Sequence, residues 1–68
     1  MTPVDYLDAV ERRYRGDPRF VSALLLSPRE GVFVAKARTL AGAVLHETAE
    51  HPTREGAARE LAQIAGAL

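Results

Sequence analysis

The chain has 68 residues, no cysteine, and nine Lys and Arg against nine Asp and Glu. The lack of cysteine excludes disulfides, thiolate nucleophiles and cysteine-based zinc sites. The zero net charge argues against a general nucleic-acid binder, which normally has a basic excess. A chain of this length is expected to fold as one domain over residues 1–68. Because so small a domain buries only about 60% of its unfolded surface, we expect self-association to supplement its core.

The sequence carries no sign of a membrane segment or a leader. Its apolar runs stay below the ~18 residues of a membrane span. At the N-terminus, residues 1–5 lack a basic region followed by an apolar one. We therefore expect a cytoplasmic protein that makes no contact with a membrane.

The first predicted helix covers residues 3–15. Thr2 is a good N-cap, Pro3 suits the first helical position, and Asp5 stands three residues after the cap, which is the spacing of a capping box. Gly16 is expected to end this helix in the left-handed conformation. A second, short helix is predicted over residues 18–26, although this stretch is too apolar for periodicity to distinguish a helix from a strand.

A long central helix is predicted over residues 28–50. Ser27, Pro28 and Glu30 repeat the capping pattern at its start. Apolar or small residues then recur at helical spacing, namely Phe33, Ala37, Leu40, Ala41, Val44 and Thr48. A last helix is predicted over residues 53–67 because Pro52 interrupts the chain before it. The predicted fold is therefore all-α, a small four-helix domain with one long central helix.

A hairpin over residues 20–38 is the alternative for the middle of the chain. Val32, Phe33 and Val34 favour a strand, and Gly31 is unfavourable four residues into a helix. Since an isolated hairpin is marginally stable, this α+β alternative would need dimerisation to complete its sheet.

No catalytic, metal or cofactor site is predicted. His46 and His51 are five residues apart, whereas the zinc-protease pattern on a helix needs a separation of four. Neither Ser22 nor Ser27 has a histidine nearby in the sequence, and no glycine-rich loop resembles a phosphate cradle. We therefore expect a protein that is not an enzyme and binds no cofactor.

Two groups of residues are candidates for binding a partner. The long helix would offer apolar anchors to a partner protein, and these candidates are Phe33, Leu40, Val44 and Leu45. A cluster of arginines could contact phosphates or an acidic partner, and its members are Arg12, Arg13, Arg15 and Arg19.

The sequence thus predicts a small protein–protein interaction module, such as an adaptor, an inhibitor or an accessory subunit. It would act as a homodimer or higher oligomer through its long helix, and it would bind another protein. The alternative is a small dimeric transcriptional regulator that inserts its C-terminal helix into DNA, with Arg54 and Arg59 reading the bases. The neutral charge makes nucleic acid the less favoured partner.

Overall fold

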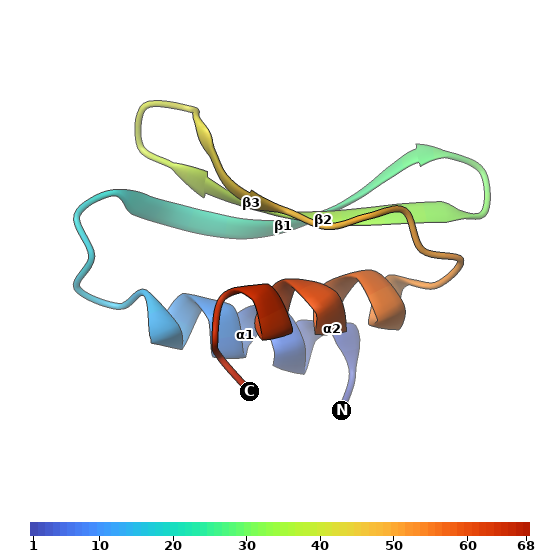
Figure 1. The fold of residues 1–68 in the computed structure, drawn as a ribbon, viewed down its shortest axis with the longest axis horizontal. Helices are drawn as coiled ribbons and strands as arrows, with labels where there is room; N and C mark the ends of the chain where they lie inside the picture. The colour runs from blue at the N-terminus through green and yellow to red at the C-terminus, as the bar shows by residue number, and fades with distance from the viewer.

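Three antiparallel strands and two helices form the fold. The computed structural model describes the backbone of residues 1–68 and every side chain except those of Phe20 and Val21. The sheet has the strand order β1-β2-β3, and both helices cover the same face of it (Figure 1). In chain order the elements are α1 (Pro3–Arg13), β1 (Phe20–Arg29), β2 (Val32–Thr39), β3 (Val44–Glu47) and α2 (Arg54–Ile64).

The predicted all-α fold is wrong, because the middle of the chain is a sheet and the protein is α+β. Residues predicted as helices 18–26 and 28–50 instead form the three strands. Gly31 lies in the turn between β1 and β2, where its φ of +74° cannot continue a right-handed helix. The capping pattern at Ser27 lies within β1, where the Ser27 hydroxyl donates hydrogen bonds to two backbone carbonyls of the hairpin, those of Arg29 and Val32.

The alternative hairpin describes β1 and β2 well, but its expected need for a dimer is wrong. The two strands pair from Phe20 opposite Thr39 to Arg29 opposite Val32, with a register shift near each end. The third strand comes from the same chain, since β3 pairs with β2 through Lys36 opposite Glu47. The sheet is therefore complete within one protomer.

The helices predicted over residues 3–15 and 53–67 are present as α1 and α2, and α1 begins where its capping residues predict. The Thr2 hydroxyl accepts from the Asp5 N–H at 3.3 Å, and the Thr2 N–H donates to the Asp5 carboxylate at 2.9 Å, which confirms the capping box. Gly16 follows α1 with a φ of +88°. Thr53 caps α2 through the N–H of Gly56 at 3.0 Å. Both helices are shorter than expected. Among the residues described, no helix is long and apolar enough to cross a bilayer.

Small side chains fill much of the space between the helices and the sheet. Leu61 and Val10 are the largest fully buried side chains, and Tyr6 lies beside them in the core. Alanines make up most of the remaining core, so the two layers can approach closely. The core alanines are Ala23, Ala35, Ala37, Ala57, Ala58, Ala62 and Ala65.

Candidate partner-binding surface

The sheet has one covered face and one open face. Ala23 and Leu25 of β1 pair with Ala37 and Ala35 of β2, and these four side chains belong to the core beneath the helices. Because side chains alternate along a strand, their neighbours point to the opposite face. We call this opposite side the outer face, and its central residues are Leu24, Leu26, Val34, Lys36 and Val44.

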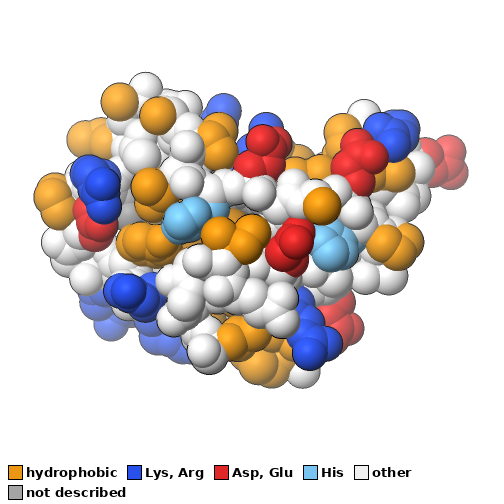
Figure 2. All heavy atoms as spheres, in the orientation of Figure 1, with side chains coloured by type: hydrophobic (Ala, Val, Ile, Leu, Met, Phe, Trp, Pro, Cys, Tyr) orange, Lys and Arg blue, Asp and Glu red, His pale blue; other side chains and the backbone are white. Residues whose placement is uncertain are grey.

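The outer face is apolar at several positions and is hollowed. Leu26 is 41% exposed and Val44 is 44% exposed, while Val34 is buried. Both ends of the sheet curve away from the helices, and a dip lies between them (Figures 1 and 2). A depression of about 290 Å³ lies on this face, and we refer to it as the hollow. Its lining residues are Leu26, Pro28, Val34, Lys36, Glu47, Thr48, Ala49 and Glu50.

Two ion pairs stand at the edge of the hollow. The Lys36 ammonium lies 3.3 Å from the Glu47 carboxylate. Arg29 donates two hydrogen bonds to Glu50, at 2.9 and 2.7 Å, in the bidentate geometry that suits a guanidinium and a carboxylate. These bonds from Arg29 lower the pKa of the Glu50 carboxyl. Each charge at the edge is therefore matched by an opposite charge, and the hollow has no excess of either sign.

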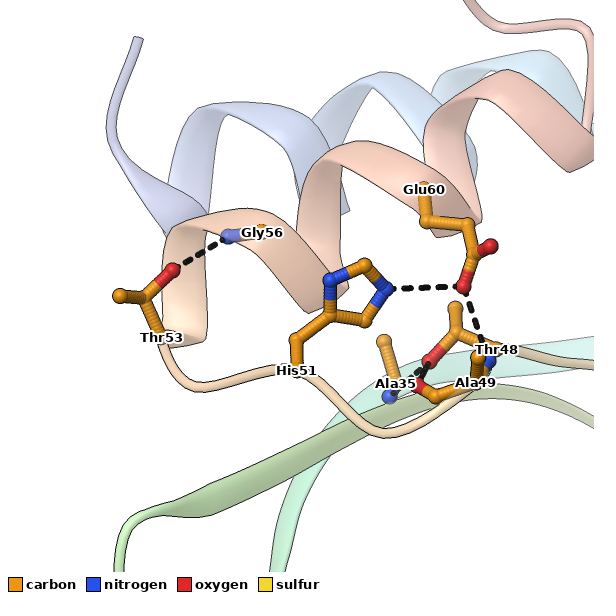
Figure 3. Close-up of polar contacts among 7 residues, drawn as sticks. All are labelled: Ala35, Thr48, Ala49, His51, Thr53, Gly56 and Glu60. Atoms are coloured by element: carbon orange, nitrogen blue, oxygen red, sulfur yellow. Dashed lines mark hydrogen bonds and ion pairs between the residues drawn. The ribbon is translucent and has the colours of Figure 1, made fainter.

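A polar network supports the floor of the hollow. The buried Thr48 hydroxyl accepts from the Ala35 N–H at 3.1 Å and donates to the Ala49 carbonyl at 2.8 Å (Figure 3). The Glu60 carboxylate of α2 accepts from the Ala49 N–H at 2.8 Å and from His51 Nε2 at 2.9 Å. Residues 48–51 are thus tied to β2 on one side and to α2 on the other.

The link between His51 and Glu60 makes stability depend on pH. The hydrogen bond from His51, followed by that from the Ala49 N–H, lowers the pKa of the Glu60 carboxyl below the ordinary value of 4.5. A carboxyl with a lowered pKa stabilises the fold above its unfolded pKa, and this contribution is lost as pH falls through the folded value. We expect Glu60→Gln to lower the urea midpoint at pH 7 and to reduce the difference between the midpoints at pH 7 and pH 3.

The matched control is Glu55→Gln, which changes an exposed carboxylate in the first turn of the same helix. This variant is expected to keep the wild-type difference between the two pH values. Equal responses from the two variants would contradict the role of Glu60.

The four predicted apolar anchors do not form one surface. Phe33 and Leu45 are half-buried and pack against the core, and the Arg54 guanidinium lies 4.9 Å from the centre of the Phe33 ring. Leu45 is the extra residue of a bulge where β2 pairs with β3. Val44 lies on the outer face, and Leu40 is 80% exposed in the turn between β2 and β3. The helical stripe that would have joined them is absent because residues 32–47 form strands and a turn.

The predicted arginine cluster lies at and after the end of α1. Arg12, Arg13 and Arg15 are exposed there. Arg19 is bound to Asp17, whose carboxylate accepts from the guanidinium at 3.2 and 3.3 Å. These bonds lower the pKa of the Asp17 carboxyl. All four arginines are therefore exposed, and the charge of Arg19 is matched by Asp17.

The two histidines serve different contacts. His46 Nε2 is hydrogen-bonded to the Tyr14 hydroxyl after α1, whereas His51 contacts Glu60 on α2. Among the described residues, no three His, Asp or Glu side chains gather where they could hold a metal ion.

Comparisons with protein families, with curated proteins and with solved structures find no match. Sequence reasoning missed the outer face, since the helical interpretation assigned its residues to other surfaces. The sequence carries little signal for it, because residues 23–26 are all apolar and show no alternation between the two faces of a strand.

Proposed function

We propose that this protein is a non-enzymatic protein-interaction module that acts as a homodimer and receives another protein on its outer face. The observation that carries the proposal is the hollow, in which apolar residues such as Leu26 and Val34 lie beside two matched ion pairs. An apolar centre surrounded by polar groups is typical of protein-binding surfaces. The outer face takes the place of the long helix as the binding element.

The size and charge of the hollow favour an aliphatic side chain of a partner protein. Its volume of about 290 Å³ lies just below the roughly 300–1,000 Å³ of small-molecule sites. A phosphate or a carboxylate would need excess positive charge, yet Lys36 and Arg29 are each paired with a glutamate. The occupant is therefore expected to be an uncharged, branched side chain such as Leu, Ile or Val, presented by a protein segment.

The polar groups around the hollow support a binding role over a catalytic one. The Thr48 hydroxyl both accepts and donates a hydrogen bond within the fold, so its proton is engaged by the Ala49 carbonyl. Covalent catalysis by a hydroxyl needs a neighbouring base that takes its proton. Thr48 instead supports the backbone of residues 48–51.

Leu26→Glu tests the outer face as the binding surface. A charge at this position lies in the apolar lining, and desolvating it on binding would be costly. We expect a protein captured from cell extract by the wild type to be lost with Leu26→Glu and kept with Ile64→Glu, a matched control on α2 where Ile64 is 45% exposed. Equal capture by both variants, with unchanged circular dichroism, would contradict the proposal.

Nucleic-acid binding is the second candidate, and the exposed Arg12, Arg13 and Arg15 favour it. The expected DNA-binding unit is absent, since residues 28–50 form no helix to precede α2. Gel shifts with duplex DNA and duplex RNA at two salt concentrations separate the candidates. Tight binding that weakens steeply with salt would favour nucleic acid over a protein partner.

A further inference from the structure

The free edge of β1 is the feature that the proposed function does not use. β1 is an outer strand of the sheet and runs for ten residues, from Phe20 to Arg29. Its first eight residues, Phe20 to Ser27, contain no charge and no proline, and between two bulges its pairing with β2 is regular from Ser22 to Leu26. Natural proteins usually use charges, prolines or bulges to prevent a long edge strand from pairing with a further strand.

The other outer strand is protected in this way. β3 has four residues, includes Glu47, and continues into residues 48–51, which carry Glu50 and His51. Short length and charged side chains both oppose the addition of another strand. Of the two edge strands, β1 is therefore the one more open to pairing with a further strand.

The hydrogen bonds of β2 show which backbone groups of β1 remain unpaired. Ala35 uses its N–H and its carbonyl on the β3 side, where they bond to Thr48. In an antiparallel pair, a residue directs both groups to the same side, and hydrogen-bonded pairs alternate with non-hydrogen-bonded pairs. Leu25 lies opposite Ala35, so the N–H and carbonyl of Leu25 point away from β2.

The same reasoning applies two residues earlier. Ala23 lies opposite Ala37, which pairs with His46 of β3. The N–H and carbonyl of Ala23 therefore also point outward. Within the part of the chain that the structure describes, no hydrogen bond reaches the outward groups of Ala23 or Leu25.

We propose that two copies of this chain join edge to edge through β1, in antiparallel pairing about a two-fold axis at Leu24. In this register Ala23 of each copy lies opposite Leu25 of the other, so the four outward N–H groups meet four outward carbonyls. The result is a continuous six-stranded sheet. The pairing rests on the proposed function, because it specifies the homodimer that the function includes.

The side chains favour the same register. Leu24 and Leu26 point to the outer face, so the dimer places Leu24 opposite Leu24 of the other copy, with each Leu26 diagonal to that pair and opposite Ser22. The partner that covers the edge is a second copy, since an antiparallel strand pair with a central two-fold axis is self-complementary. The outer faces of both copies remain open and lie side by side, which doubles the surface available to a partner protein.

Two variants that introduce opposite charges at Leu24 test the pairing. Leu24→Lys places two like charges opposite each other at the axis and removes two leucines from the interface. By sedimentation at micromolar concentration we expect a wild-type dimer and, for Leu24→Lys, a dissociation constant raised about tenfold or more. Leu24→Glu should dissociate likewise, and an equimolar mixture of the two variants should restore the dimer. Val44→Lys, on the outer face of the distant β3, should remain a dimer.

Amide hydrogen exchange of the wild type gives an independent measurement. The N–H groups of Ala23 and Leu25 should exchange slowly in the dimer and faster on dilution. A dimer that survives both Leu24 variants, or one that Val44→Lys dissociates as strongly, would overturn the edge pairing and leave the proposed function standing. A wild-type monomer at these concentrations would overturn the edge pairing and also the homodimer in the proposed function.

Discussion

Leu61→Ala is expected to reduce the free energy of unfolding by about 2–5 kcal/mol, the usual cost of truncating a fully buried leucine. Leu61 is completely buried and is one of the two largest side chains in that condition. A chain of this length has a total stability of roughly 3–10 kcal/mol, because native domains have about 0.05–0.15 kcal/mol per residue. The substitution should therefore remove a large part of the free energy of unfolding, as measured by urea titration with circular dichroism.

Ile64→Ala is the matched control for this experiment. It lies three residues further along α2, but its side chain is 45% exposed, so truncation removes less buried apolar area and leaves no closed cavity. We expect a much smaller loss than that of Leu61→Ala. Equal losses from the two variants would show that the face of α2 carrying Leu61 does not pack on the sheet as described.

The sequence predicts the starts of α1 and α2 well because they are set by local contacts. Thr2 and Asp5 are three residues apart and form the capping box without help from the rest of the fold. Thr53 caps α2 in the same local way. Such interactions depend on spacing along the chain, so they can be found in the sequence itself.

The sheet could not be found in the same way, because strand pairing is set by distant residues. Leu25 lies opposite Ala35, and Phe33 pairs with His51, far along the chain. The alternating pattern of β1 is weak, because both of its faces carry apolar residues. Leu25 lies on the covered face and Leu24 lies on the outer face. Ser27 and Pro28 meanwhile imitate the start of a helix. Local signals therefore favoured a helix where tertiary contacts stabilise a hairpin.

The hollow could not be predicted from the sequence for a related reason. The hollow is built from three separate segments, with Leu26 on β1, Val34 on β2 and Ala49 after β3. Their proximity follows from the register of the strands, which a helical interpretation cannot supply. Among the predicted anchors, Val44 does lie on the outer face, but Phe33 lies on the covered face instead.

Enlarging an alanine between the helices and the sheet is expected to cause the second large loss of stability. Ala35 is fully buried on the inner face of β2, where α2 packs above it. Ala35→Leu adds three carbons to this close contact, and overpacking of this kind typically costs about 1–3 kcal/mol, and occasionally more. For a domain of 60–100 residues, each kcal/mol shifts the melting temperature by about 4–8 °C. We expect a clearly lowered melting temperature in a thermal scan followed by circular dichroism.

Ala43→Leu makes the same chemical change at an exposed position in the turn between β2 and β3. It should leave the melting temperature within about 2–4 °C of the wild type, since surface substitutions rarely change stability by more than about 0.5 kcal/mol. If Ala35→Leu is tolerated equally well, the helices cannot lie as close to the sheet as its alanines require. Close approach is the reason for small residues at this site, because a leucine at Ala35 would have to push α2 away from β2. That displacement would also strain the bonds from Glu60 to residues 49 and 51, which support the floor of the hollow.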